Sequence, residues 1–291
     1  MAALTALALA VASAPAGAVF ENVTVNPRVR AMGDAGVAVA DPAFAAYQNP
    51  AVLGATGHGV AAASYVRPYS LDFTDLLYAG GAIPLNERLG AIGLGLRHFV
   101  VDYQGVNLLQ ETAITASHGI NLYQDIHSTV NLGYAVNVYR VEFAETVTGV
   151  DPGNDTTVGL DAALYVTLHE RTRLGILARN LNTPTIGRNE EELQQRLNAG
   201  IAYEPYAGVI TTFEIENQLG EDVQYHGGME AEIVAGFRVR SGVMTGPSKL
   251  TGGFGYTRAG FSVDYGFSTG GGTLDSTHQF GLAYSFGGEQ P

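Results

Sequence analysis

The stretch VNLGYAVNVY, residues 130–139, alternates between large apolar residues and small or polar ones. Its even-numbered positions hold Val, Leu, Tyr, Val and Val, and its odd-numbered positions hold Asn, Gly, Ala, Asn and Tyr. Successive side chains of a β-strand point to opposite faces of the sheet. The pattern therefore predicts a strand with one apolar face and one polar or small face.

The same alternation recurs on both sides of this stretch. It is clearest in residues 89–97, 158–169, 260–267 and 280–286. In all, about fourteen such segments follow one another. They start near residues 58, 73, 88, 108, 127, 156, 173, 196, 207, 225, 235, 250, 259 and 276.

The linkers between these segments carry a second signal, because short linkers take turns with longer, polar ones. The short ones are residues 86–88, 169–173, 204–208 and 257–259. The longer ones are residues 101–107, 143–156, 182–195, 217–224 and 268–276. The linker 121–126 is the exception, since it is longer than its place in the series predicts. Bacterial outer-membrane barrels have short periplasmic turns, longer outer loops and an even number of strands.

These patterns predict an all-β fold, a 14-stranded antiparallel transmembrane β-barrel over residues 58–286, followed by a C-terminal tail at 287–291. No internal run is apolar over the roughly 18 residues that a membrane helix needs. The apolar faces carry Tyr and Phe near strand ends, as interfacial aromatic girdles do. A soluble β-sandwich or β-helix is the alternative, but a sandwich of this length usually forms two domains joined by a linker, and the sequence shows no such linker.

Residues 1–18, MAALTALALAVASAPAGA, have the features of a secretory signal peptide. An apolar core runs from Leu4 to Val11, and Ala16-Gly17-Ala18 forms an Ala-x-Ala cleavage site. A buried N-terminal helix is the alternative, but the Pro and Gly of this segment would end a helix early. We therefore expect export and, given the barrel, a location in the bacterial outer membrane in contact with its lipid.

Composition and motifs exclude several classes of function. The formal net charge of −13 argues against a nucleic-acid partner, because Lys and Arg must neutralise phosphates. The chain has no cysteine, and its seven His are scattered without metal-ligand spacing on one element. It contains no P-loop and no Gly-x-Ser-x-Gly motif. We expect no cofactor and no enzymatic activity; an outer-membrane hydrolase stays as an alternative, since a barrel can bring distant residues together.

Residues 28–54, RVRAMGDAGVAVADPAFAAYQNPAVLG, differ from the rest of the chain. We expect residues 19–57 to form an N-terminal hatch that fills or caps the barrel. The glycine spacing in its first part suits close backbone packing or a tight turn. We also expect a short strand at 37–40 and a short helix at 43–48, started by Asp41 and Pro42 and ended by Asn49 and Pro50.

Two parts of this hatch resemble a known signature. Residues 29–41, VRAMGDAGVAVAD, and residues 47–53, YQNPAVL, are similar to the N-terminal signature of the PorV/PorQ family, a branch of the FadL-like outer-membrane proteins. Residues 174–181, 228–242, 250–267 and 277–286 resemble the same family more weakly. The sequence departs from the family pattern at Asp34 and Val52, where glycine is frequent. The hatch-motif residues are Arg30, Met32, Gly33, Gly36, Asp41, Asn49 and Pro50.

The resemblance implies a 14-stranded barrel, which agrees with the number of alternating segments. It also implies a hatch that plugs the lumen. In FadL-type members hydrophobic substrates pass through the barrel. PorV-type members belong instead to the type IX secretion machinery and carry secreted cargo to a surface attachment complex.

The alternation places several charged residues on the inner face of the barrel. They are Arg97, Asp161, Glu214, Glu216, Glu230, Glu232, Arg238, Arg240 and Asp264. These residues either line a lumen that guides a ligand or form ion pairs that fix the hatch to the wall. We favour ion pairs, because unpaired charges in a narrow lumen are costly. Arg28 and Arg30 are the natural partners of the acidic wall, and small wall residues such as Gly93 and Gly133 leave room for a hatch rather than for a wide pore.

Two classes of function follow. The main hypothesis is an outer-membrane component or accessory of a type IX-like system for protein secretion or surface attachment, with secreted or surface proteins as partners. The alternative is a FadL-like channel for uptake or export of hydrophobic small molecules. A channel predicts an apolar pocket between hatch and wall and a lateral opening, typically at a kinked strand. An accessory barrel predicts a sealed lumen.

Overall fold

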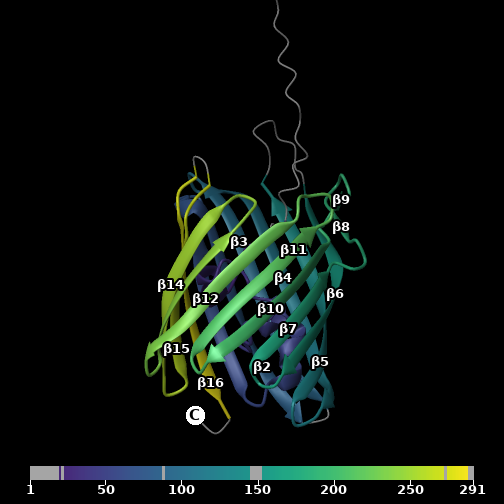
Figure 1. The fold of residues 1–291 in the computed structure, drawn as a ribbon. Coiled ribbons are helices and arrows are strands. Elements are labelled where there is room, and N and C mark those ends of the chain that lie inside the picture. The colour runs from purple at the N-terminus through teal and green to yellow at the C-terminus, as the bar shows by residue number, and fades with distance from the viewer. Residues whose placement is uncertain (1–19, 21–22, 87–88, 145–152, 272–273, 288–291) are drawn as a thin grey trace, which may run out of the picture.

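The computed structural model is a closed β-barrel of fourteen antiparallel strands, which pair in sequence order until the last strand meets the first (Figure 1). It describes residues 20, 23–86, 89–144, 153–271 and 274–287. The predicted fold class is thus confirmed. The predicted signal peptide, residues 1–18, lies outside the described residues. No helix in the described part of the chain is long and apolar enough to cross a membrane.

Each barrel strand begins within two residues of the position predicted from the alternation. The barrel strands are β1 (Gly59–Arg67), β2 (Thr74–Asn86), β3 (Gly90–Tyr103), β4 (Val106–Gln124), β5 (Ser128–Phe143), β6 (Asn154–Leu168), β7 (Thr172–Arg179), β10 (Arg196–Tyr206), β11 (Val209–Gln218), β12 (Gln224–Val234), β13 (Phe237–Met244), β14 (Lys249–Arg258), β15 (Phe261–Ser268) and β16 (Thr277–Phe286). A small hairpin of β8 (Thr185–Ile186) and β9 (Glu191–Glu192) lies in the loop between β7 and β10.

Short turns gather at one end of the barrel, together with the C-terminal end of β16, and most longer loops gather at the other. We call these the turn end and the loop end. The linker 121–126 is not the predicted exception, because β4 continues through it to Gln124. Asp125 then closes a tight turn by accepting hydrogen bonds of 2.7 Å from the backbone N of both His127 and Ser128.

The longer linker predicted at 101–107 is also wrong. Strands β3 and β4 continue into it and leave a two-residue turn, Gln104-Gly105, with φ of 55° and 79°. Two successive positive φ angles are the signature of a type I′ hairpin turn, whose twist matches that of paired strands.

The loop between β7 and β10 folds inward at the loop end instead of standing free in solvent. Its Ile186 and Leu193 are buried against the inward-facing Ala113, Tyr139 and Val141 of β4 and β5. This loop therefore covers part of the lumen from the loop end.

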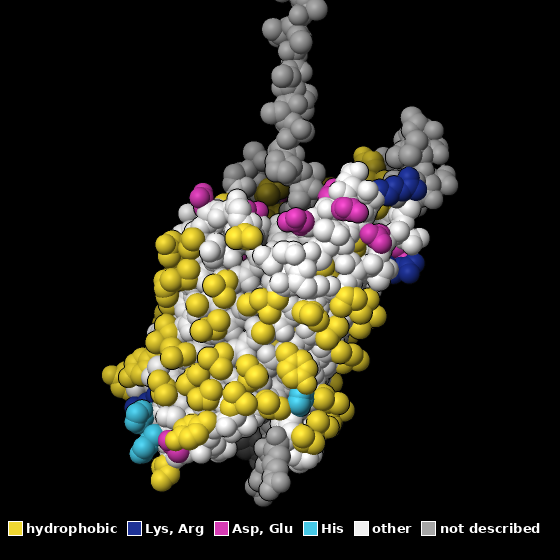
Figure 2. All heavy atoms as spheres, turned by 90° about the vertical axis from the view of Figure 1, so that its right-hand side faces the viewer, with side chains coloured by type: hydrophobic (Ala, Val, Ile, Leu, Met, Phe, Trp, Pro, Cys, Tyr) yellow, Lys and Arg dark blue, Asp and Glu magenta, His cyan; other side chains and the backbone are white. Residues whose placement is uncertain are grey.

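The outer face of the barrel is apolar. Large aliphatic and aromatic side chains on successive strands are exposed there, including Leu94, Ile114, Val138 and Phe280. Figure 2 shows hydrophobic side chains covering the middle and lower part of one face, with Asp and Glu along the upper, loop end. Such a band on the outside of a closed barrel is the surface that a transmembrane barrel presents to lipid.

The hatch enters the lumen and follows the inner wall. It contains α1 (Pro27–Ala31), α2 (Ala45–Gln48) and the 3₁₀ helix η1 (Pro50–Ala55), while a second 3₁₀ helix, η2 (Pro68–Ser70), lies after β1 in the β1–β2 loop. The predicted strand at 37–40 is wrong, since these residues form turns and the inner wall offers them no free strand edge. The predicted helix at 43–48 is shorter, because residues 42–44 form a turn before α2.

Ile114 and Leu108 offer a matched test of the membrane-facing surface, because both are outward-facing on β4 and 46% exposed. Ile114 lies at mid-strand and Leu108 near the loop end. We expect Ile114→Arg to destabilise the barrel by about 2–4 kcal/mol and Leu108→Arg by about 0–1 kcal/mol, since the cost of a lipid-facing Arg falls with distance from the midplane. Unfolding in lipid vesicles, read from the heat-modifiable gel mobility of the folded barrel, measures both. Equal and small losses of stability in the two variants would contradict a β4 that faces the membrane.

Candidate functional site

A ring of wall glycines receives the hatch. They are Gly93, Gly119, Gly133, Gly175, Gly200, Gly228, Gly242, Gly253, Gly266 and Gly281, each on a different strand from β3 to β16. A Cβ at Gly175 would collide with the carbonyl of Val37, and one at Gly133 with the backbone of Ala51. Only glycine allows the backbone of the hatch to lie this close to the wall.

One buried ion-pair chain ties the hatch to the wall. Arg28 of the hatch holds Glu230 with two hydrogen bonds of 2.8 Å, from Nε to Oε2 and from Nη2 to Oε1. Arg240 donates from Nε to the same Glu230 at 2.6 Å and from Nη1 to Asp264 at 2.6 Å. Two arginines and two carboxylates thus share their charges, which offsets part of the cost of burying them.

Hydrogen bonds from wall side chains hold the backbone of the hatch along its length. The backbone N of Gly33 donates to Thr251 Oγ1 at 2.8 Å, and that of Val37 donates to Glu214 Oε2 at 2.8 Å. His226 donates from Nδ1 to the carbonyl of Gly33 at 2.8 Å, because a carbonyl can only accept. The hatch is therefore docked to the wall by specific bonds as well as by close packing.

The hatch-motif residues lie at these contacts or inside the hatch itself. Arg30 donates from Nε to Gln279 Oε1 at 2.6 Å, so its main wall partner is a neutral amide and not the acidic wall as predicted. Met32 is fully buried against wall glycines, and Gly33 has a φ of +71°. Asn49 accepts from the backbone N of Ala51 at 3.0 Å and so begins η1 at Pro50.

The remaining motif residues support the hatch from within. Gly36 packs against Val29 and accepts a hydrogen bond of 2.8 Å from Gln48 Nε2. Asp41 accepts from Asn26 Nδ2 at 2.8 Å instead of capping a helix. Burial raises the pKa of Asp41, while Arg28 and Asn26 act in the opposite direction. Asp34, one departure from the family pattern, has a φ of 60°, the left-handed conformation that glycine adopts most easily.

The other predicted lumen charges take different positions. Arg97 lies 3.9 Å from Glu111, and Asp161 accepts from Asn137 Nδ2 and from the backbone N of Asn180, both at 2.9 Å. Glu232 and Arg238 pair with each other at 2.9 Å near the turn end, where their side chains are 30% and 33% exposed. Among the described residues, no hydrogen bond joins this last pair to the hatch.

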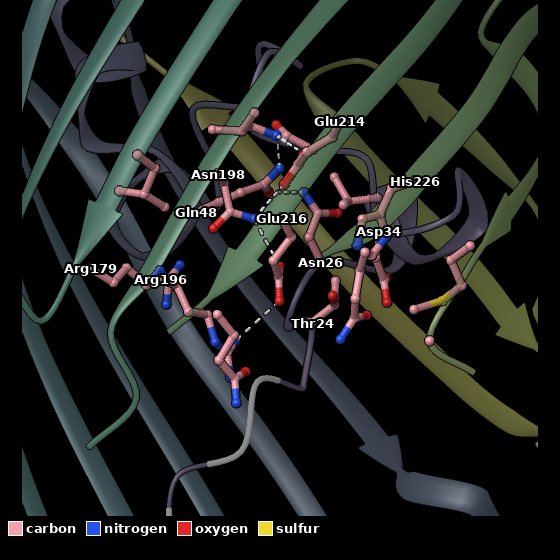
Figure 3. Close-up of a pocket in the computed structure, with 18 of the residues that line it drawn as sticks. Thr24, Asn26, Asp34, Gln48, Arg179, Arg196, Asn198, Glu214, Glu216 and His226 are labelled. Carbon is pink, nitrogen blue, oxygen red and sulfur yellow. Dashed lines mark hydrogen bonds and ion pairs between the residues drawn. The ribbon is translucent and has the colours of Figure 1, made fainter. Parts of the chain in front are cut away.

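A cavity of about 290 Å³ lies between hatch and wall in the loop-end half of the lumen (Figure 3). Its lining is polar and charged. Glu214 and Glu216 project into it from β11, and Asn198 Nδ2 donates to both, at 2.6 and 2.8 Å. Arg179 and Arg196 lie on one side, and Asp34 and His226 on the opposite side. The apolar pocket that a channel for hydrophobic molecules predicts is therefore not what this part of the lumen contains.

Three polar atoms of this lining are buried without a hydrogen-bond partner: Arg196 Nε, Asp34 Oδ1 and His226 Nε2. Since Nδ1 of His226 carries the proton given to Gly33, its Nε2 is an acceptor in the neutral ring. Buried polar atoms are nearly always paired in folded proteins, so unpaired atoms around a cavity mark it as a candidate ligand site. Sequence reasoning identified Glu214 and Glu216 but missed Arg179, Arg196, Asn198 and His226. The same inward alternation within β10 and β12 was the signal that could have found the last three.

An apolar groove of about 590 Å³ lies outside the wall at the same level, over β11 to β14. Phe213, Tyr225, Val243 and Leu250 line it. His226, Met244 and Lys249 border both groove and inner cavity. The strand pairing between them is continuous, with Gly227 opposite Val243, so the lateral opening predicted for a channel is absent from this part of the described wall.

No group of three or more metal-ligating side chains comes together in the described residues. No protein-family model matches the chain, and a search of curated proteins finds no match. Solved structures do match it along nearly its whole length. The monoaromatic hydrocarbon channel CymD has a TM-score of 0.65 at 14% identity, with 91% of this chain and 98% of that chain covered.

Two further solved structures superpose similarly. A FadL homologue of Pseudomonas aeruginosa has a TM-score of 0.60 at 12% identity, covering 92% of this chain and 99% of its own. The toluene transporter TodX of Pseudomonas putida has a TM-score of 0.60 at 12% identity, covering 92% and 98%. The chain therefore has the fold of FadL-like barrels.

Glu230 and Glu232 allow a matched test of hatch docking, because they face inward two residues apart on β12. We expect Glu230→Gln to loosen the hatch, since it leaves Arg28 and Arg240 without their shared buried carboxylate, a loss of up to about 3–5 kcal/mol. Glu232→Gln removes a partly exposed pair and should change stability by about 0–1 kcal/mol. Amide hydrogen exchange of residues 24–55 measures docking, and equal exchange in both variants would contradict the anchoring role of Glu230.

Proposed function

We propose that the chain is a bacterial outer-membrane channel for small organic molecules, in which the hatch is the gate. The observation that carries this proposal is the cavity of about 290 Å³ between hatch and wall, bordered by loop-end residues such as Tyr69 and Lys249. By analogy with outer-membrane barrels, the loop end faces the outside of the cell and the turn end faces the periplasm. An inner site above a hatch is what a gated uptake channel needs.

The neighbours in fold support a channel rather than a secretion component. CymD is a monoaromatic hydrocarbon channel and TodX is a toluene transporter. A cavity of this volume suits a molecule of about one ring, at the lower end of ordinary ligand sites. Membership of the PorV/PorQ branch stays a prediction from the hatch motif, and a role in secretion gains no support from these neighbours.

The charged lining argues for solutes that carry a polar group. Glu214, Glu216 and Arg196 are each at least nine-tenths buried, and a bare hydrocarbon would leave the unpaired atoms of the cavity without partners. The outer groove beside Phe213 and Val243 is the apolar surface at this level.

A reversible disulfide between the hatch and the wall tests whether the hatch acts as a gate. A Cβ at Gly93 would lie 2.9 Å from the Cβ of Ala46 in α2 and 2.7 Å from Ser117 Oγ, and a disulfide requires about 3.8 Å between Cβ atoms, so a disulfide between Ala46→Cys and Gly93→Cys requires α2 to move slightly away from the wall. The chain has no other cysteine. We expect oxidation to abolish uptake of radiolabelled benzoate, and any uptake of toluene, by Gram-negative cells that lack their own FadL-type channels, and reduction to restore it.

The single variant Ala46→Cys is the control, and its uptake should not respond to oxidant. Full uptake by the oxidised double variant would show that the hatch is a permanent stopper beside the true route. Uptake no higher than in cells without the protein, for both solutes and in every redox state, would overturn the channel itself.

A further inference from the structure

We infer that the lumen contains a subsite for a carboxylate group, and that the solutes of this channel are small organic anions. That the bound anion is a transported solute rests on the proposed function, but the subsite itself rests on three arginines. A second, smaller cavity of about 20 Å³ lies beside Tyr47, next to the main cavity and against the inward-folded loop between β7 and β10. Its lining residues are Phe20, Tyr47, Arg97, Tyr139, Arg179, Asn180, Leu193, Gln194 and Arg196.

The described walls of this small cavity hold three guanidinium groups and no carboxylate. The net charge of the protein is −13, so a cavity lined by three arginines and no carboxylate runs against the general composition. Guanidinium groups match the planar geometry of a carboxylate and hold it with two parallel hydrogen bonds. The residue types around the cavity therefore favour an anion of this shape.

Arg196 has donor capacity left for such an anion. It is 8% exposed, and its Nε has no hydrogen-bond partner. Its Nη2 donates to Gln194 Oε1 at 2.5 Å, and its Nη1 lies 3.9 Å from Glu216 Oε1, beyond the range of a direct hydrogen bond. A buried guanidinium with an unused N–H costs stability unless a ligand completes it.

Arg179 and Arg97 complete the cationic wall. Arg179 stacks over the ring of Tyr47, 4.2 Å from its centroid, and donates to the Tyr47 carbonyl. This stacking holds the guanidinium of a long, flexible side chain in place. Arg97 adds a third positive charge, with Glu111 at 3.9 Å.

The neighbouring polar groups are already occupied. Tyr139 donates its hydroxyl to Asn180 Oδ1 at 3.1 Å, and Asn180 Nδ2 donates to the carbonyl of Gln194 at 2.9 Å. The carboxylates nearest to the cluster, Glu111, Glu216 and Asp161, do not line the small cavity. The unpaired Nε–H of Arg196 therefore remains available to donate a hydrogen bond to a ligand.

The size of the small cavity and its position beside the main cavity indicate what the rest of the solute is. A volume of 20 Å³ holds about one water-sized group, such as one oxygen of a carboxylate. The small cavity and the main cavity share Tyr47, Arg179, Gln194 and Arg196. A carboxylate seated among the arginines would thus leave the body of the molecule in the 290 Å³ cavity, beside the aromatic ring of Tyr47. Single-ring carboxylates fit this division, whereas a long apolar tail would meet the charged lining.

Equilibrium dialysis of the purified full chain in detergent tests the subsite, with benzoate as the probe and benzamide as its neutral isostere. We expect benzoate to bind about tenfold or more tightly than benzamide, as charge-assisted hydrogen bonds require. Arg196→Gln should weaken benzoate binding by a similar factor and leave benzamide unchanged. Arg196→Lys keeps the positive charge but lacks the planar guanidinium that forms two parallel hydrogen bonds. It should weaken benzoate binding by an intermediate factor.

Arg238→Gln is the matched control, because it removes another lumen arginine that lines neither cavity. Its benzoate affinity should equal that of the wild type, and heat-modifiable mobility should show each variant folded. Chloride and inorganic phosphate serve as competitors. Displacement of benzoate only by other aromatic carboxylates supports a solute site, and full displacement by stoichiometric chloride identifies a resident inorganic anion instead.

Equal affinity for benzoate and benzamide, or equal losses in Arg196→Gln and Arg238→Gln, would overturn the subsite. The subsite and the channel can fail separately. Uptake of toluene that responds to the hatch disulfide, without benzoate binding, would leave the channel and remove the subsite. Benzoate binding without uptake of either compound would leave the subsite and remove the channel.

Discussion

The rest of the structure depends on one constraint: the hatch lies directly against glycines of the barrel wall, which have no side chain to hold it away. Ten strands each contribute a glycine to this surface, and a Cβ at Gly133 or Gly175 would meet hatch backbone atoms. Close packing then brings Arg28 within reach of Glu230, and Val37 within reach of Glu214. The lumen cavity is the space that this arrangement leaves open.

Alternation along the chain predicted the barrel well, because a strand's side-chain period of two is a local property that lipid on one side and a packed lumen on the other preserve. Strand starts were correct to within two residues. The errors came where a strand ran on into a tight turn, as at Gln104 and Gly105. Only the backbone conformation of these residues distinguishes such a turn from a loop.

The candidate site was less predictable, because its residues come from the hatch, from β7 and β10 to β14, and from loops at the loop end. Alternation placed Glu214 and Glu230 on the inner face, yet it could not tell which one would bind Arg28. Arg179 is the last residue of β7 and Arg196 the first of β10, and only the path of the hatch brings both beside Tyr47. Arg30 binds Gln279, a partner that charge alone does not suggest.

The fold that this chain shares with hydrocarbon channels encloses a polar lumen. The apolar surface lies on the outer wall, at Phe213 and Val243, while the inner cavity presents arginines, carboxylates and unpaired polar atoms. On the proposed function, the polar inner cavity and not the apolar outer groove selects the solutes that pass.

The most direct measurement is an experimental structure of the full chain with 4-iodobenzoate or 4-iodotoluene, in which anomalous scattering locates the iodine. We expect the iodine of 4-iodobenzoate in the cavity between hatch and wall, with its carboxylate toward Arg196 and Arg179 and its ring beside Tyr47. Iodine found only in the outer groove beside Phe213 and Val243 for both compounds, or nowhere in the lumen, would contradict a solute site between hatch and wall.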